Sequence, residues 1–270
     1  MVPRHETRQG RRNVSFEACA QIVERGDPDR FGAAMACPPA ARQVLFPLYA
    51  FNVEVSRAPW VTQEPMIAEM RLQWWRDALD EIATQGAVRK HEVTTPLADV
   101  LDVDGAKALD ALVAARRWDI YKDAFQDAGH FVDYLRNTGG LLMWQAARLL
   151  GAPEDTRLAV TNIGAATATS RYLAAAAALE ASGRIPLVNG THQGISTLAL
   201  NSAADAGSVR KVAKRLPPQA RPALMEAWMA KPTLLQIAAE PVRVADGAIG
   251  ISPFRNRMRL AIWATTMGLR

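Results

Sequence analysis

The sequence predicts an all-α protein, and three observations lead to this fold class. Apolar residues recur at spacings of three and four along most of the chain, which places them on one face of a helix. Segments that alternate strictly between apolar and polar residues, as strands do, are almost absent. Proline and glycine separate the helical segments at short intervals. We therefore expect one helical bundle over residues 15–270, without repeats or a linker.

The composition is that of an ordinary globular chain, with 49% hydrophobic and 22% charged residues among 270. The formal net charge of +5 permits an anionic partner. Lysine and arginine are spread along the chain, so we do not expect nucleic-acid binding. The two cysteines, Cys19 and Cys37, indicate a reducing, cytoplasmic environment, and no Cys/His pair has the spacing of a zinc site.

The N-terminal part begins with an arginine-rich segment that lacks the apolar stretch of a secretory signal. We expect residues 1–14 to be a basic disordered tail. The first helix then covers 16–23, with Ser15 as its N-cap. The Asp-Pro-Asp turn at 27–29 leads into a short helix or turn over 30–35.

Two neighbouring helices, 44–56 and 65–83, are expected to organise the core. Prolines at positions 59 and 65 separate them, because proline cannot continue a helix interior. The second helix is strongly amphipathic, and we expect its buried face to contain Met70, Trp74, Trp75, Ala78, Leu79 and Ile82. Adjacent tryptophans are a large apolar load, so core packing is the default interpretation and a wall for an apolar ligand is the alternative.

A long helix is expected over 107–128, after a helix that begins at Thr95 and is broken at 102–104. Asp119 and Asp123 would lie one turn apart on it, a spacing that suits a metal.

The next expected helix, 131–150, contains Gly139 and Gly140, each of which lowers helix stability by about 1 kcal/mol. They indicate either a close helix–helix contact or the wall of a ligand site.

The C-terminal part continues with helices that we expect over 158–179, 196–200 and 206–215, then one that begins at 217–218, is interrupted at 231–232 and resumes over 233–239. A terminal helix over 253–269 is basic on one side, at Arg255, Arg257 and Arg259, and apolar on the other. This pattern fits peripheral contact with a membrane through residues 253–270, and it equally fits the last helix of a bundle with an exposed basic face.

Two segments carry a resemblance to a known family. Residues 48–51 read Leu-Tyr-Ala-Phe, and further along Arg71, Trp74, Trp75 and Leu79 follow the pattern R-x-x-W-W-x-x-x-L. This combination resembles the head-to-head prenyl synthases of the squalene/phytoene synthase family. The resemblance implies an isoprenoid-synthase-like helical bundle with a central cavity, in which two Asp-rich clusters hold magnesium and a prenyl diphosphate.

The chain departs from the family pattern at both clusters. Positions 56–60 read Ser-Arg-Ala-Pro-Trp where the first cluster is expected, and Glu54 is the nearby acid. Positions 174–178 are all alanine where the second is expected, ahead of Gly183 and Arg184. A diphosphate leaving group needs a divalent ion held by carboxylates, so without them ionisation of an allylic diphosphate is not expected.

The chain is similar instead to the non-catalytic branch of the family, which includes a respiratory complex I assembly factor. The segments A-F-N-V-E at 50–54 and M-R-L-Q-W-W-R-D-A at 70–78 carry this similarity. It implies a pseudoenzyme that uses no cofactor and binds a respiratory-complex subunit or a lipid- or isoprenoid-like small molecule. The expected location is the cytoplasm, with peripheral contact at an inner membrane, or the mitochondrial matrix in a eukaryote.

The candidate residues for the cavity or its ligand are Phe51, Asn52, Glu54, Arg71, Gln73, Trp74, Asp77, Arg171 and Arg184. No catalytic residue or metal ligand is expected under this hypothesis. The alternative is an active prenyltransferase with a displaced magnesium site built from Glu54, Asp77, Asp119 and Asp123. A structural protein with no ligand is a third reading. For Arg71 and Arg171, an ion pair competes with an anion-binding role.

Overall fold

The computed structural model describes residues 8–250 and 252–267. This part of the chain is helical and contains no strand, which confirms the predicted all-α class. Its α helices have these bounds: α1 Arg8–Gly26, α2 Pro28–Met35, α3 Pro39–Arg57, α4 Pro65–Ala83, α5 Thr94–Val100, α6 Val103–Arg116, α7 Ala128–Leu135, α8 Leu141–Leu149, α9 Arg157–Ala181, α10 His192–Gly207, α11 Val209–Ala213, α12 Ala230–Ala239, α13 Val242–Ala245 and α14 Pro253–Thr266. Four 3₁₀ or π segments are also present in this part of the chain: η1 Arg117–Ile120, η2 Arg136–Gly140, η3 Glu154–Thr156 and η4 Pro218–Met229.

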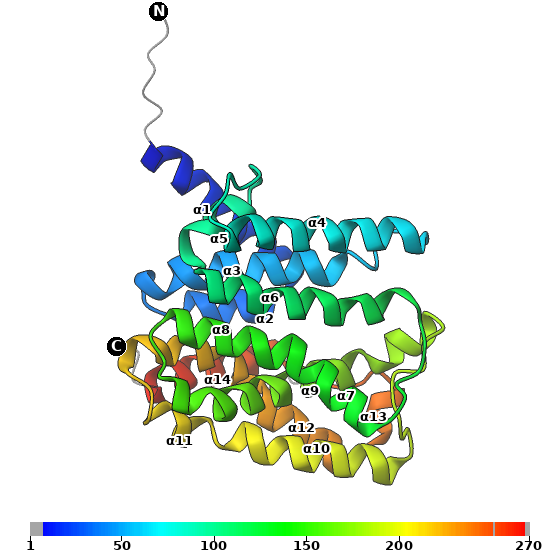
Figure 1. Cartoon of the computed structure of the whole chain (residues 1–270). Coiled ribbons are helices and arrows are strands. Elements are labelled where there is room, and N and C mark those ends of the chain that lie inside the picture. Colours follow the sequence, from blue (N-terminus) through cyan, green and yellow to red (C-terminus); the bar gives the residue numbers. More distant parts are fainter. Residues whose placement is uncertain (1–7, 251, 268–270) are drawn as a thin grey trace, which may run out of the picture.

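The helices stack in layers that run roughly side by side (Figure 1). Helix α4 packs on α6, and α1 packs on α3. Below them, α9 is the longest helix and contacts α8, α10 and η2. The site described below lies between α9 and the elements that surround it, so the bundle itself creates the cavity.

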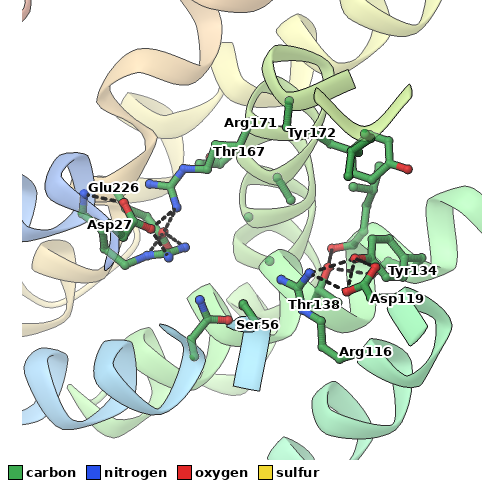
Figure 2. Close-up of a pocket in the computed structure, with 18 of the residues that line it drawn as sticks. Asp27, Ser56, Arg116, Asp119, Tyr134, Thr138, Thr167, Arg171, Tyr172 and Glu226 are labelled. Atoms are coloured by element: carbon green, nitrogen blue, oxygen red, sulfur yellow. Dashed lines mark hydrogen bonds and ion pairs between the residues drawn. The ribbon is translucent and has the colours of Figure 1, made fainter. Parts of the chain in front are cut away.

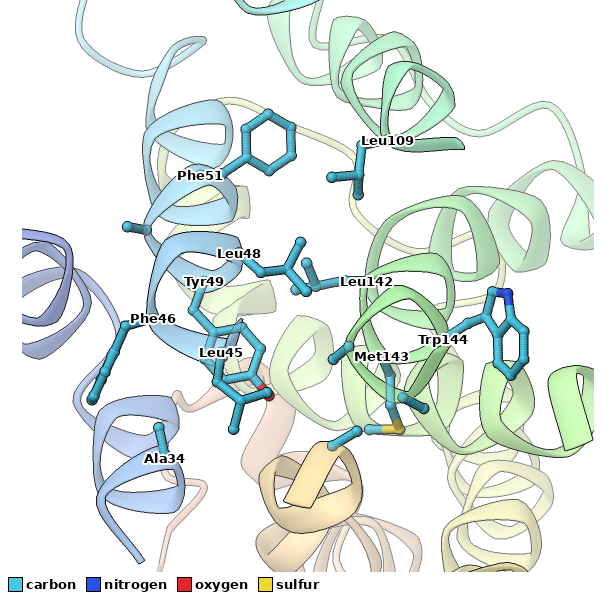
Figure 3. Close-up of a cluster of buried hydrophobic side chains, with 14 of the residues drawn as sticks. Ala34, Leu45, Phe46, Leu48, Tyr49, Phe51, Leu109, Leu142, Met143 and Trp144 are labelled. Carbon is cyan, nitrogen blue, oxygen red and sulfur yellow. The ribbon is translucent and has the colours of Figure 1, made fainter. Parts of the chain in front are cut away.

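The main core forms where α3 meets α8 (Figure 3). Helix α3 is apolar almost all round over the segment that contains Leu45, Phe46 and Phe51, so it is buried on every side. Leu142 of α8 fills the space opposite, and Trp144 is buried on the far side of α8 (Figure 3). This packing fixes the position of α3, whose next turn lines the site.

Helix α4 buries a narrower face than the sequence pattern predicts. Its buried residues are Ala68, Leu72, Trp75, Ala78, Leu79 and Ile82. Met70 is 67% exposed, so its assignment to the buried face was wrong, and Trp74 is only half-buried. Successive residues of an α-helix are rotated by about 100° around its axis. Met70 lies five positions before Trp75 and Trp74 lies one position before it, so both side chains point away from the direction of Trp75.

The predicted helix over 107–128 is also wrong, because α6 ends at Arg116 and a 3₁₀ turn follows. Lys122 adopts a left-handed conformation with φ 55°, which ends the helical path. A new helix then begins at Ala128, where the Asp127 side chain accepts a hydrogen bond from the backbone N–H of His130 at 2.8 Å. Asp119 and Asp123 therefore do not share a helix face.

Helix α1 begins at Arg8, within the segment 1–14 that was expected as a basic tail. The rest of that tail, 1–7, lies outside the described residues. Within the described part of the chain, no helix combines the length and apolarity that crossing a bilayer requires.

Candidate functional site

A cavity of about 260 Å³ lies in the middle of the bundle, beside α9 (Figure 2). Residues of α2, α3, α6, α7 and α9 and of the segments η1, η2 and η4 line it. Its lining residues are Asp27, Arg30, Asn52, Ser56, Trp60, Arg116, Asp119, Tyr134, Leu135, Thr138, Gly139, Gly164, Thr167, Ala168, Arg171, Tyr172, Ala175, Leu179 and Glu226. We call this cavity the central pocket. Three arginines and three carboxylates lie among these residues, so the described lining is balanced in charge.

One wall of the central pocket is a buried ionic cluster that joins α2, α9 and η4 (Figure 2). Asp27 is the N-cap of α2 and accepts from the backbone N–H of Arg30 at 3.0 Å. The Arg30 guanidinium contacts Asp27 at 2.5 Å and Glu226 at 2.6 Å. Arg171 approaches the same carboxylates, at 3.1 Å from Asp27 and 3.7 Å from Glu226. Two arginines thus share two acids.

The cluster shifts the pKa values of Asp27 and Arg30 in the directions that favour their charged forms. Burial alone would raise the pKa of Asp27, but the positive charges of Arg30 and Arg171 outweigh it and keep that pKa below its ordinary value. Burial would lower the pKa of Arg30, yet Glu226 and Asp27 raise it overall. Nearby Tyr49 has a pKa well above the ordinary value, mainly because it is buried. Near neutral pH, Asp27 and Arg30 therefore stay charged and Tyr49 stays neutral.

The opposite wall is built around Asp119, which η1 places next to η2 and α7. The Tyr134 hydroxyl donates to both Asp119 oxygens, at 2.9 and 3.0 Å, and Arg116 donates to one of them at 3.2 Å. Arg116 also donates to the Tyr134 oxygen at 2.8 Å. Burial raises the pKa of Tyr134, so the phenol stays protonated and acts as a donor.

Arg184 and Trp60 lie at the edge of the central pocket. The Arg184 guanidinium sits 4.6 Å from the centroid of the Trp60 ring, a cation–π contact. Arg184 also donates to the backbone carbonyl of Asp119. The stack ties the segment after α9 to the segment after α3, so two connections meet at the pocket edge.

Two polar atoms of the central pocket are buried without a hydrogen-bond partner. One is Oε1 of Glu226, whose residue is only 3% exposed, and the other is Nε of Arg116 on the opposite wall. A buried polar atom left unpaired costs about 1–3 kcal/mol. The acceptor and the donor belong to residues that line facing walls of the central pocket.

The floor of the central pocket is made by a close approach between η2 and α9. A Cβ added at Gly164 would lie 2.6 Å from the Gly139 carbonyl oxygen, so only glycine allows this contact. Both glycines also line the pocket. The two readings of the glycine pair at 139–140, a helix contact and a ligand wall, are thus compatible for Gly139.

Asn52 and Arg171 are the cavity candidates that the structure brings into the central pocket. Arg184 is at its edge. At the sites where the Asp-rich clusters were expected, Ser56 and Trp60 line the pocket on one side and Ala175 on the other. None of these three side chains carries a carboxylate.

The other cavity candidates lie elsewhere. Phe51 is in the main core against Trp75, and Glu54 pairs with Arg57 at 3.4 Å. Arg71, Gln73 and Asp77 are on the exposed side of α4, where Gln73 donates to Asp77 at 2.8 Å. Trp74 packs against Trp75 and lies under the Arg89 guanidinium. None of these six lines the central pocket.

The magnesium site of the transferase alternative does not fit these positions. Asp77 is exposed on α4, Asp123 is exposed in the segment before α7, and Asp119 is committed to Arg116 and Tyr134. Among the described residues, no group of three or more His, Cys, Asp or Glu side chains could hold a metal. Magnesium in the central pocket could reach a set of carboxylates only by displacing the arginines that bind Asp27 and Asp119, because among the described pocket acids only Glu226 has an oxygen without a partner.

Sequence reasoning missed several residues of the central pocket as site residues: Asp27, Arg30, Arg116, Tyr134, Tyr172 and Glu226. One signal was available, because Glu226 interrupts the apolar run Leu224, Met225, Ala227, Trp228 and a buried acid needs a partner. Its partner Arg30 is 196 positions away, which no local pattern reveals.

Comparisons with known proteins agree with this architecture. The sequence model of the squalene/phytoene synthase family matches residues 23–251. Among solved structures, a dehydrosqualene synthase in complex with ligand has a TM-score of 0.81 at 14% identity and covers 97% of this chain and 99% of its own. Squalene synthase HpnC from Alicyclobacillus acidocaldarius has a TM-score of 0.71 at 15% identity, covering 89% and 97%. At such identities the likeness establishes the fold alone.

Curated relatives carry a different name. "NADH dehydrogenase (ubiquinone) complex I, assembly factor 6 homolog" of Drosophila melanogaster is 33% identical over 100 residues, 36% of this chain and 30% of the relative. "NADH dehydrogenase (ubiquinone) complex I, assembly factor 6" of Bos taurus is 23% identical over 145 residues, 49% and 40% respectively. The matched part therefore spans less than half the length of either relative.

Proposed function

Because the chain belongs to the squalene/phytoene synthase family, we propose that it is a non-catalytic member that acts in respiratory complex I assembly and binds a lipid-like ligand in its central pocket. The observation that carries the proposal is the pairing of carboxylates. Asp27, Glu226 and Asp119 are the acids among the described pocket residues, and each is bound by an arginine. Acids held in this way are poor ligands for the divalent ion that diphosphate ionisation needs.

The size of the central pocket supports the same proposal. Head-to-head condensation must hold two prenyl diphosphates together, whereas this cavity measures about 260 Å³. Sites for drug-sized ligands span about 300–1,000 Å³. The volume suits one small ligand or the end of a larger one.

The electrostatics indicate which ligand the pocket accepts. Its described charges cancel, so a diphosphate would leave several negative charges uncompensated, while an uncharged head group would not. A hydroxyl can donate to Oε1 of Glu226 or accept from Nε of Arg116, the two unpartnered atoms. Leu135, Ala168 and Leu179 provide apolar surface for a hydrocarbon tail. A prenyl alcohol combines these features.

The role in complex I assembly comes from the names of the curated relatives and from the family. An assembly role needs a surface or pocket that recognises a partner, and it needs no turnover. The transferase alternative remains the competing proposal, and it requires a set of free carboxylates that the described pocket lining does not supply.

The first test is turnover. The purified chain is incubated with farnesyl or geranylgeranyl diphosphate and magnesium, and products are measured by mass spectrometry. We expect none above a heat-denatured control. Magnesium-dependent condensation that Asp119→Ala abolishes would overturn the non-catalytic proposal and support the transferase.

The second test is binding to the central pocket. Farnesol at about 100 times its Kd should raise the midpoint of thermal unfolding by about 5 °C. Ala175 is exposed and lines the pocket, so Ala175→Phe should block entry and remove the shift. The exposed neighbour Ala174 does not line it, so Ala174→Phe is the matched control and should keep the shift. Equal shifts in both variants would place the ligand elsewhere.

The third test is assembly in cells that lack the gene. We expect less assembled NADH:quinone oxidoreductase, restored by the wild-type chain. Asp77→Ala should also restore it, because Asp77 is a surface residue of α4 here and a metal ligand only under the alternative. Rescue by Ala174→Phe without rescue by Ala175→Phe would tie assembly to the central pocket. Normal assembly in the deletion would contradict the proposed role.

A further inference from the structure

A second cavity, larger than the central pocket, lies where α14 crosses the C-terminal helices (α14 is the red helix in Figure 1). Its volume is about 700 Å³. We call it the basic groove, and it is lined by Ala206, Gly207, Arg210, Ala227, Trp228, Lys231, Pro232, Arg255, Met258, Arg259, Ile262 and Trp263. Helices α10, α11 and α12 with η4 form one side, and α14 forms the other.

Four cations face each other across the basic groove. Arg210 and Lys231 come from α11 and α12, and Arg255 and Arg259 from successive turns of α14. The described lining contains no acid, and none of the four forms an ion pair with a described residue. The central pocket shows the contrast, because each of its arginines faces a carboxylate or its hydrogen-bonding network. Four unpaired cations in one cavity attract an anionic occupant.

Apolar side chains lie directly beside these charges. Phe254, Met258 and Ile262 are spaced four apart on α14, and they are 75%, 50% and 53% exposed. The other face of α14 packs on the core through Leu260, Trp263, Ala264 and Met267. An exposed apolar stripe next to a basic one is the pattern of a helix that lies on a membrane surface. The stripe is therefore available to hydrocarbon while the cations are available to phosphate.

We propose that the basic groove binds the phosphate head group of an anionic phospholipid, with the Phe254–Met258–Ile262 stripe in contact with its acyl chains. This inference does not depend on whether the central pocket is catalytic. The phosphate lies between four cations, with Arg255 and Arg259 on one side of it and Arg210 and Lys231 on the other. Trp263, whose other contacts are with the core, closes the floor of the groove between the two sides.

Other anions satisfy less of this geometry. Free inorganic phosphate would neutralise cations but would leave the exposed stripe uncovered. An acidic peptide would also pair with the cations, yet it gains nothing specific from three large apolar side chains in a row. A lipid head group with attached chains matches both features, so the membrane surface is the occupant that the groove fits.

The test uses the full chain and co-sedimentation with vesicles. One set is pure phosphatidylcholine, and the other contains phosphatidylcholine and phosphatidylglycerol in equal parts. We expect binding to the mixed vesicles only, and we expect it to weaken as salt rises, because exposed charges are screened. Equal binding to both sets, or to neither, would overturn the proposal.

Variants separate the basic groove from general positive charge. Arg255→Gln/Arg259→Gln removes one side and Arg210→Gln/Lys231→Gln removes the other. Each pair should weaken partitioning about thirtyfold, since each surface cation contributes a factor of about five. Arg71→Gln/Lys90→Gln removes the same two charges from exposed positions outside the groove and should change binding little. An equal loss of vesicle binding in this control would mean that net positive charge, and not the basic groove, drives binding, and it would overturn the proposal.

Two further readouts keep the outcome decisive. Circular dichroism checks folding, and if one groove variant fails to fold, the other carries the test. Ile262→Asn should weaken vesicle binding while leaving the affinity for soluble poly-glutamate unchanged. If poly-glutamate competes fully with the vesicles and Ile262→Asn has no effect, the occupant is an acidic protein segment and the lipid proposal is wrong.

Discussion

Arg30 and Arg255 carry the same charge in very different surroundings. Arg30 is buried and bound by Asp27 and Glu226, so its charge is spent on the fold and on the wall of the central pocket. Arg255 lines the basic groove and has no ion-pair partner among the described residues. Partner availability, and not residue type, therefore distinguishes a structural arginine from one that can bind a ligand.

Cys19 and Cys37 are fully buried, and burial raises the pKa of each thiol to about 12. Because the thiolate is the reactive form, both should be inert in the folded protein. With Ellman's reagent at pH 8, we expect the native chain to react at least about 100-fold more slowly than the chain in denaturant. Ser252→Cys adds an exposed thiol as a control and should react at once. Rapid reaction of two thiols in the native wild type would contradict the burial.

At the residue scale, the sequence predicted the members of the site that local patterns can carry. Asn52 follows a recognisable motif, and Arg171 lies in the segment where an acidic cluster was expected. Arg30 and Glu226 were not predicted as site residues. Each is buried as the ion-pair partner of the other, and they are 196 positions apart in the sequence. Arg71 and Asp77 were proposed from a shared motif, but the rotation of α4 turns them to solvent.

At the scale of elements, the contact between η2 and α9 forms the floor of the central pocket. A π turn at Arg136–Gly140 lets α7 and α8 continue as one rod, and α9 lies against it through Gly164. Thr138 and Thr167 donate to carbonyls of their own helices, at 2.7 and 2.8 Å, so both hydroxyls are satisfied within the wall.

Gly164→Ala tests this contact. Its Cβ would meet the Gly139 carbonyl oxygen at 2.6 Å and the Gly140 Cα at 2.8 Å, so the helices must separate. We expect the free energy of unfolding to fall by about 1–3 kcal/mol, despite the better helix propensity of alanine. Gly32→Ala in α2 is the control, because its Cβ meets only a side-chain carbon at 3.4 Å, and it should be neutral or slightly stabilising. Urea denaturation measures the free energy of unfolding of both variants. An equal change in the two would mean that α9 and η2 are not in tight contact.

Helix periodicity predicted most elements correctly, but it failed where specific contacts set the end of a helix. The segment 107–128 keeps an apolar spacing of three and four, yet α6 stops at Arg116. The side chain of Asp127 caps a new helix, and Lys122 turns the backbone between them. Caps and left-handed residues act at single positions, so a pattern averaged over a window does not detect them.

At the scale of the whole molecule, the buried ionic cluster connects parts that are far apart in sequence. Arg30 in α2, Arg171 in α9 and Glu226 in η4 meet at Asp27 or at one another. The same four residues form one wall of the central pocket. The residues that hold these elements together therefore also line the site. A substitution that destabilises the fold here should also change ligand binding in the central pocket.

Glu226→Leu should show how much this closure contributes. It leaves Arg30 buried with Asp27 alone, and removing one partner of a buried pair costs about 3–5 kcal/mol. The double variant Arg30→Met/Glu226→Leu removes the stranded charge and should recover most of the loss, with Asp27 still paired to Arg171. Glu154→Leu breaks an exposed pair with Arg157 and should cost less than about 1 kcal/mol. Chemical denaturation gives all three free energies. If Glu226→Leu cost no more than Glu154→Leu, the cluster would be dispensable for the fold, and pairing of its acids would have to be explained by the ligand that the central pocket binds.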